Sequence, residues 1–155
     1  MSGYIHASAL ILGEHGVLVR GAAGSGKSRL VLALLALASA RGLFARLVGD
    51  DRIGLQAVGG RLLARPHPAI AGQIEQRGTG ILALAHESKA ILSLVVDLAP
   101  AHEHPPRLPD ETDAVVMLEA IGLPMIALSP LLGGQEAAEI VLAALRRKNL
   151  TLSPQ

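Results

Sequence analysis

The sequence predicts an α/β fold in a single domain, with a mixed central sheet, extra antiparallel strands and a C-terminal helix. Three observations predict it. The chain has 155 residues, the usual length of one domain. Half of the residues are hydrophobic, which is enough to bury a core of Leu, Ala, Val and Ile, since there is one Tyr, one Phe and no Trp. The chain contains many short apolar segments typical of strands but only two long segments typical of helices, so strands and helices are not expected to alternate regularly.

The first elements are expected to be two strands joined as a hairpin. Residues 5–12 form an apolar stretch typical of a strand, and residues 13–16 contain the glycines of a turn. Residues 16–20 then form a second short, buried strand. This hairpin leads directly into a glycine-rich loop.

The glycine-rich loop has the full pattern G-x-x-x-x-G-K-[ST], which predicts a phosphate-binding loop (P-loop). It stands between the predicted strand 16–20 and residues 29–38, whose Ala and Leu content indicates a helix. The N-terminus of a helix favours anions, so the context supports the motif. The chain is therefore expected to bind a nucleoside triphosphate, ATP. The predicted nucleotide-binding residues are Gly21, Ala22, Ala23, Gly24, Ser25, Gly26, Lys27 and Ser28.

Each position of the loop has a physical reason. Gly21, Gly24 and Gly26 permit backbone conformations that let successive N–H groups point at phosphate oxygens. Lys27 supplies a positive charge for the β- and γ-phosphates, and Ser28 supplies a hydroxyl for Mg²⁺. A simple glycine-rich turn is the alternative, and the complete motif in its strand–helix setting argues against it.

The remaining elements follow from apolar runs and turn residues. The helix is expected to end near Arg41 and Gly42. Gly59 and Gly60 indicate the turn of a hairpin. A last amphipathic helix is expected to carry a basic end. The predicted strands are residues 45–48, 53–58, 61–64, 81–84, 90–97, 115–119 and 124–128, the last two paired around Gly122, and the final helix is 135–147.

Several histidines are expected to lie in loops. The proline-rich segment 100–109 predicts an exposed loop, so the cluster His102, Glu103 and His104 is interpreted as solvated surface rather than a metal site. His67 and His86 are also interpreted as loop residues.

Composition excludes several classes of protein. Lys and Arg total 14 and Asp and Glu total 13, and few aromatic residues are available to stack on bases, so no nucleic acid is expected as a partner. The absence of cysteine excludes disulfides and thiolate metal sites. No targeting segment and no run long enough to span a bilayer is visible, so a cytoplasmic protein without membrane contact is expected.

Asp50 and Asp51 follow an apolar strand and are candidates for chemistry. One carboxylate could hold Mg²⁺, while its neighbour projects the other way and could contact an acceptor hydroxyl. The alternative is structural, because Asp pairs also start turns by bonding to backbone N–H groups.

Residues 75–80 read E-Q-R-G-T-G and contain a second candidate. Gly78 and Gly80 beside Arg77 indicate a bent backbone that presents a cation to a transferring phosphoryl group. An ordinary turn into a strand is the alternative. His6, inside an apolar strand, is by itself most simply a core or edge histidine.

Together and in this order, these features resemble the catalytic domain of the HPr kinase/phosphorylase family. In that family a histidine on the first strand precedes the phosphate loop, an Asp-Asp pair follows the loop helix, and the signature Glu-Ile-Arg-Gly-x-Gly-Ile comes next. The matching residues here are His6, residues 21–28, Asp50, Asp51 and Arg52, and residues 75–81, with Gln76 in place of Ile. The resemblance covers residues 4–98 well and the last third loosely.

The resemblance implies an ATP- and Mg²⁺-dependent serine kinase whose partner is the small phosphocarrier HPr. It also implies phosphorolysis, the attack of inorganic phosphate on phosphoserine with release of pyrophosphate. In the carried-over roles Asp50 is the base, His6 lies near it, and Arg77 steadies the transferring group. The implied metal ligands are Ser28, Asp51 and Glu75. The resemblance further implies a homo-oligomer, a hexamer, and the mean hydropathy of +0.44 is compatible with buried subunit contacts.

The chain departs from the family pattern in three places. It resembles the short form seen in some proteobacteria, without the N-terminal domain of larger members. Residues 85–90 lack the usual Gly/Ala-rich loop with an arginine, and residues 129–134 lack the usual basic loop. Two other functions stay open: a small-molecule kinase, with residues 100–113 as a substrate lid, and an ATP-sensing module without catalysis.

Overall fold

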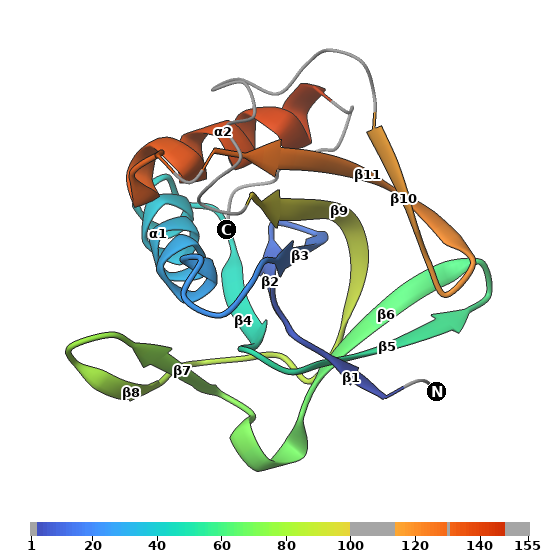
Figure 1. Cartoon of the computed structure of the whole chain (residues 1–155), viewed down its shortest axis with the longest axis horizontal. Coiled ribbons are helices and arrows are strands. Elements are labelled where there is room, and N and C mark those ends of the chain that lie inside the picture. The colour runs from blue at the N-terminus through green and yellow to red at the C-terminus, as the bar shows by residue number, and fades with distance from the viewer. Residues whose placement is uncertain (1–2, 100–113, 130, 148–155) are drawn as a thin grey trace.

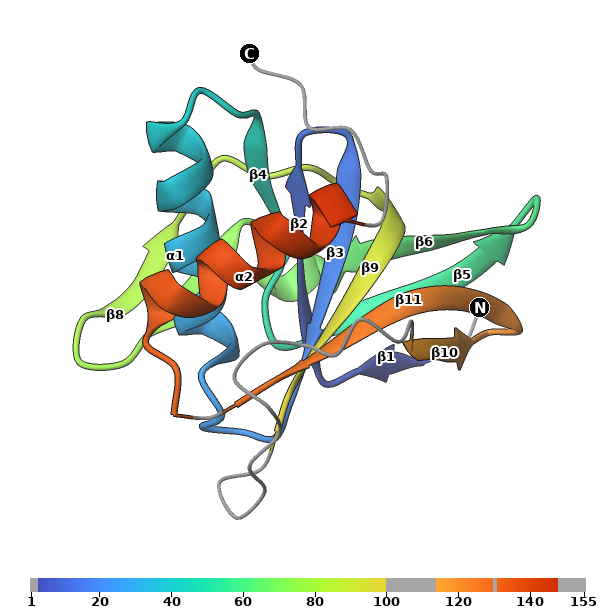
Figure 2. The ribbon, with the colours of Figure 1, turned by 90° about the horizontal axis from the view of Figure 1, so that it is seen from above.

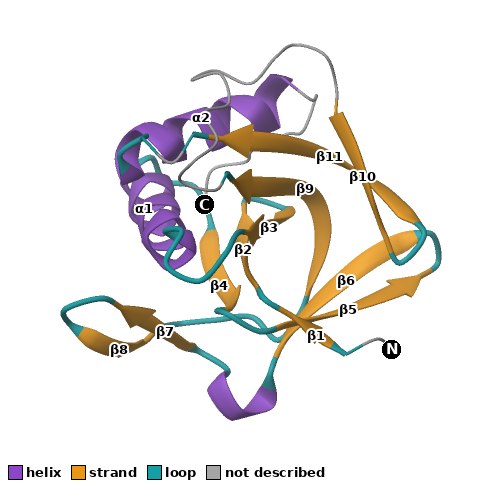
Figure 3. Ribbon diagram, in the orientation of Figure 1, coloured by secondary structure: helices purple, strands orange, loops and turns teal. Residues whose placement is uncertain are grey.

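The computed structural model describes residues 3–99, 114–129 and 131–147, which form a large mixed sheet, two long helices and a separate two-stranded sheet (Figures 1 and 3). The strands are β1 (Tyr4–Ile5), β2 (Ala7–Leu12), β3 (His15–Arg20), β4 (Ala45–Gly49), β5 (Ile53–Val58), β6 (Arg61–Pro66), β7 (Gln73–Gln76), β8 (Gly80–Ala83), β9 (Ala90–Leu98), β10 (Ala114–Leu118) and β11 (Ile121–Leu128). The helices are α1 (Lys27–Ala40), the short 3₁₀ helix η1 (Pro68–Ile70) and α2 (Gly134–Arg147).

Strand β9 organises the large sheet, whose main order is β1-β5-β6-β9-β3-β2-β4. It runs parallel to β3 and to β11, and antiparallel to β6. The β6 contact uses Ala90 and Ile91 at the start of β9, whereas the β11 contact uses residues 95–98 at its end. Strand β9 thus connects the hairpins β5–β6 and β10–β11 to the central strands of the sheet.

Two apolar cores lie on the two faces of this sheet. Both long helices cover one face and pack against each other (Figure 2). In α1 the buried residues Leu30, Val31, Leu34 and Ala38 recur at helical spacing, so they form one stripe toward the sheet. The second core lies on the other face, between the central strands and the hairpins β5–β6 and β10–β11.

The predicted fold class is confirmed as far as a mixed α/β sheet with a C-terminal helix. The hairpin turn at Gly59 and Gly60 is also confirmed, since both residues have positive φ. The turn between β10 and β11 was placed wrongly. It lies at Glu119 and Ala120, with φ of 49° and 64°, and Gly122 lies inside β11. A Cβ on Gly122 would lie 3.3 Å from the Sδ of the exposed Met117 side chain on β10.

The proline-rich segment 100–109, with His102, Glu103 and His104, lies outside the described residues. His67 and His86 are loop residues, as predicted. His67 accepts a hydrogen bond from the Ala69 N–H at the start of η1, and the His86 ring packs against Gly72. Within the described ranges, no helix combines the length and apolar character needed to cross a membrane.

Candidate active site

The glycine-rich loop joins the end of β3 to the start of α1. Gly24 and Gly26 have φ of 77° and 99°, conformations that side-chain-bearing residues rarely adopt, and Gly26 is the N-cap of α1. Before the loop, Arg20 donates two hydrogen bonds of 2.7 Å to Asp97 on β9. This bond to Asp97, opposed in part by burial, raises the pKa of Arg20. The paired ends of β3 and β9 therefore fix where the loop begins.

Lys27 is the buried cation of this loop, with 6% of its surface exposed. Its Nζ donates to the carbonyl oxygens of Gly21 at 2.9 Å and Ala22 at 3.2 Å, and lies 3.0 Å from His6 Nε2. Burial lowers the pKa of Lys27, while the charges of Asp51 and Asp50 oppose that shift. The ammonium group is thus held within the loop that is expected to receive phosphate.

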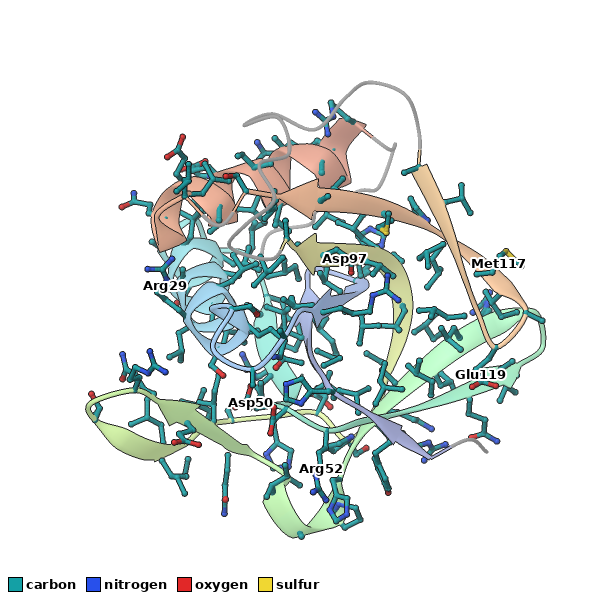
Figure 4. All side chains as sticks on the ribbon, in the orientation of Figure 1. Arg29, Asp50, Arg52, Asp97, Met117 and Glu119 are labelled. Carbon is teal, nitrogen blue, oxygen red and sulfur yellow. The ribbon has the colours of Figure 1, made fainter. Side chains whose placement is uncertain are left out.

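Asp50 is a buried carboxylate directly after β4, below the first turn of α1 (Figure 4). It accepts hydrogen bonds from the hydroxyls of Ser8 at 2.7 Å and Ser28 at 2.9 Å. Its second oxygen accepts the Glu75 N–H at 3.3 Å. The carboxylate thus connects β2, the glycine-rich loop and β7.

Asp51 has different surroundings from its neighbour. Its φ of 67° turns the chain, and its side chain is 57% exposed. Its Oδ1 lies 3.0 Å from His6 Nδ1, so His6 stands between Asp51 and Lys27. The described partner of His6 on this turn is Asp51, the neighbour of Asp50, and the role expected for His6 near Asp50 stays a prediction.

The hairpin β7–β8 carries the other predicted site residues. Glu75 and Arg77 are exposed, and Glu75 reaches Asp50 only through its backbone N–H among the described contacts. A Cβ placed on Gly24 would lie 3.9 Å from Arg77 Nη2, so the Arg77 guanidinium lies close to the glycine-rich loop. The structure therefore brings all the predicted site residues to one region.

The site fits the groups that it is expected to bind. The buried hydroxyl of Ser25 has no hydrogen-bond partner among the described residues, as expected for a donor reserved for an anion. Among the residues that the structure describes, no three His, Cys, Asp or Glu side chains lie close enough together to hold a metal ion without further ligands. Mg²⁺ in phosphoryl-transfer sites usually needs only one or two protein ligands, because phosphates and water supply the rest.

Comparison with known families agrees with this geometry. Residues 2–153 match the model of the HPr Serine kinase C-terminal domain. The chain belongs to this family. The HPr kinase/phosphorylase of Neisseria meningitidis is 30% identical over 90% of this chain and 45% of its own length. That of Aromatoleum aromaticum is 32% identical over 88% of this chain and 45% of its own length. The chain thus spans less than half the length of these relatives.

A solved structure of the same family has the same fold. The Hpr(Ser) kinase/phosphatase from Coxiella burnetii superposes with a TM-score of 0.76 at 25% sequence identity. The match covers 96% of this chain and 98% of that one. The overall fold of the chain therefore has a solved counterpart.

Sequence reasoning missed one residue of the site, Ser8. It is fully buried on β2 and contacts both aspartates, through the Asp50 carboxylate and the Asp51 N–H. A signal was present, because Ser8 is the one hydroxyl in the apolar run of residues 7–12. Buried polar side chains usually have a specific partner, and this one lies next to the predicted site.

Proposed function

We propose that this chain is an ATP-dependent serine kinase that phosphorylates the phosphocarrier HPr, and that residues 1–155 act as one catalytic domain. The observation that carries the proposal is the pair of unlike carboxylates beside one glycine-rich loop. Asp50 is buried against the Ser28 hydroxyl, while Asp51 is exposed beside His6. A kinase needs both a group at the metal and a group at the acceptor hydroxyl, and membership of the family supplies the choice of acceptor.

The nucleotide phosphates are proposed to bind residues 21–28. Lys27 would exchange the carbonyls of Gly21 and Ala22 for phosphate oxygens, and backbone N–H groups at the start of α1 would complete the site. Mg²⁺, when bound, neutralises negative charge on the phosphates. Ser28 and Asp50 are the residues placed to hold it, because their side chains already contact each other. Glu75 stays a candidate ligand beside them.

Asp51 is proposed as the base, in place of Asp50. A carboxylate that already accepts bonds from two hydroxyls and one N–H has little freedom to receive a further proton, whereas Asp51 is open to a protein substrate. Asp51 would accept the proton of the substrate serine hydroxyl as its oxygen bonds to the γ-phosphorus. His6 orients Asp51, and Arg77 offers positive charge to the transferring group.

The same groups would also serve phosphorolysis. Asp51 would accept the proton of inorganic phosphate as an oxygen of that phosphate attacks the phosphorus of phosphoserine and the bond to the serine oxygen breaks. Asp51 would then return the proton to the serine oxygen, and the products are serine and pyrophosphate. No additional reactant is required.

Assembly and location are proposed from the family and the surface. A homo-oligomer, the hexamer implied by resemblance, agrees with large exposed apolar side chains such as Val115, Met117 and Ile81. Light scattering after gel filtration tests it, since a monomer would have a mass of 16.0 kDa. The cytoplasm, where ATP and phosphocarriers are available, is the proposed location.

The decisive experiment is intact-mass spectrometry of an HPr-type phosphocarrier incubated with this protein, ATP and Mg²⁺. A phosphoryl adduct on serine is expected, and addition of excess phosphate should remove it with release of pyrophosphate. A stable adduct would restrict the proposal to the kinase reaction. No adduct, with ATP still bound, would reject it in favour of a small-molecule kinase or an ATP sensor.

A further inference from the structure

We propose that Ser8 is a positioning residue that sets the relative orientation of the two site aspartates. The inference rests on the proposed function for its effect on the reaction, and on described contacts for its geometry. Ser8 lies on β2, outside the glycine-rich loop, the aspartate pair and the signature hairpin.

The fold aims Ser8 at the site. Side chains alternate along a strand, so Ser8 shares a face with Leu10 and Leu12, which pack into the core beneath the helices. Ser8 lies on this face near the N-terminal end of β2, and through Asp50 it is linked to Ser28 at the start of α1. Beside it, the pairing of β2 with β4 shifts register between Ala9 and Leu10. Such irregularities re-aim backbone and side chains, and here β4 ends next to the Ser8 hydroxyl.

The Ser8 hydroxyl uses both of its hydrogen-bonding capacities on the aspartate pair. It donates to Asp50 Oδ1 at 2.7 Å and accepts from the Asp51 N–H at 3.2 Å. The side chain is fully buried, so water does not compete for these bonds. One atom thus links the carboxylate of Asp50 to the backbone of Asp51.

This link adds a contact from β2 to each aspartate. Asp51 has a left-handed φ of 67° in a turn that the Arg52 N–H closes by donating to the Asp50 carbonyl at 2.8 Å, and the Ser8 hydroxyl accepts the Asp51 N–H within that turn. Asp50 also contacts Ser28, whose hydroxyl is expected to serve Mg²⁺. The Ser8 bond to Asp50 does not depend on that hydroxyl. Ser8 therefore keeps Asp51 beside His6 while Asp50 remains at the loop.

The kinetic test compares Ser8→Ala with Ser8→Thr, which retains the hydroxyl. Ser93→Ala is the matched control, because Ser93 also lies on a strand of this sheet but pairs with His15 away from the site. We expect Ser8→Ala to lower kcat about 10- to 100-fold with little change in the KM for ATP, as misplacement of reacting groups does. Ser8→Thr should restore most of kcat, and Ser93→Ala should leave it unchanged.

A second measurement tests the geometry without activity. Hydrogen exchange of the Asp51 amide, followed by NMR, should be at least about tenfold faster in Ser8→Ala than in the wild type, because its acceptor is lost. If the wild type transfers no phosphoryl group but this exchange difference appears, the proposed function fails and the positioning role stands. Unchanged Asp51 exchange, or a kcat unchanged in Ser8→Ala, would overturn the inference. The inference would also be overturned if Ser8→Ala and Ser8→Thr lost kcat equally and both also had a lowered Tm, because the loss would then reflect destabilisation and not the missing hydroxyl.

Discussion

Asp50 and Asp51 are neighbours in the chain, yet their surroundings suit them to different tasks. Asp50 is buried among hydroxyl and N–H donors, which hold its carboxylate in one orientation. Asp51 turns outward on a left-handed backbone and meets His6. Because a base must reach its substrate and a metal-holding group must stay in place, we propose Asp51 as the base and Asp50 at the metal, the reverse of the roles implied by the resemblance.

Asparagine substitutions separate these roles. Asp51→Asn should lower kcat by at least about 100-fold, the usual effect of removing a general base, and leave the affinity for Mg²⁺-ATP nearly unchanged. Asp50→Asn should lower both that affinity and the Tm, because an amide nitrogen cannot accept the bonds that surround it. Steady-state kinetics and calorimetry measure the two effects, with Glu139→Gln on the surface of α2 as a control. If Asp50→Asn lost phosphoryl transfer but kept its affinity for Mg²⁺-ATP, Asp50 would be the base instead.

Lys27 gives a pH-dependent prediction. Burial lowers its pKa in the folded protein below the ordinary value of 10.5. Between these two values the unfolded chain binds more protons, so this group makes the free energy of unfolding rise with pH. Urea unfolding from about pH 8 to about pH 10 should show that rise in the wild type and a smaller one in Lys27→Met. Identical slopes would mean that Lys27 loses its proton equally easily in both states.

The same Lys27→Met variant should bind ATP about 10- to 100-fold more weakly, since a charge-assisted bond to phosphate is lost. Arg29→Met is the control, because Arg29 follows the loop but bonds to the Leu132 carbonyl. Titration calorimetry distinguishes the two variants. Equal affinities for both would argue against phosphate binding at Lys27.

At the scale of elements, the hairpin β7–β8 forms its own sheet beside the glycine-rich loop. Its Arg77 is exposed and approaches the loop near Gly24. We expect Arg77→Ala to lower kcat about 10- to 1,000-fold with a smaller effect on ATP affinity, as for other groups that stabilise a transition state. Arg77→Lys should recover only part, because lysine lacks the planar fork of donors. A change confined to the KM for ATP would make Arg77 a nucleotide-binding residue.

The parallel pair β3–β9 depends on a close backbone approach. A Cβ on Gly16 would lie 2.4 Å from the Ile91 carbonyl oxygen, a distance that forces the strands apart. Gly16→Ala should therefore lower the free energy of unfolding by about 1–3 kcal/mol, the usual cost of overpacking. Gly133→Ala, where nothing lies within 4 Å, is the control. Denaturant unfolding measures both, and equal stability would mean that β3 and β9 separate easily.

The elements that the sequence predicted well are those with local signals. Gly59 and Gly60 form a hairpin turn because glycine readily adopts the positive φ that the turn requires. The motif of the loop 21–28 is likewise contained within consecutive residues. Long-range features were not predictable in this way. The two-part pairing of β9, the contact of His6 with Asp51 and the reach of Ser8 depend on strands that meet only after folding. The turn at Glu119 and Ala120 was missed because neither residue favours positive φ.

At the scale of the whole molecule, the central strands contribute to both apolar cores. On β3, Val17 and Val19 face the helices while Leu18 faces the second core, and β2 alternates in the same manner. Strand β9 also contributes to both cores, although its alternation is interrupted between Leu92 and Leu94, where its pairing with β3 shifts register. Neither core can lose its packing without disturbing strands that the other requires. The described structure should therefore unfold in one cooperative step.

Truncations in the two cores test this coupling. Leu34→Ala on α1 and Leu62→Ala on β6 each remove a fully buried side chain, one from each core. Each should lower the free energy of unfolding by about 2–5 kcal/mol. Both should shift the same single transition, seen by circular dichroism and calorimetry, since the one Tyr and absent Trp give little fluorescence signal. Two separate transitions, each moved by only one of the substitutions, would show that the cores unfold independently.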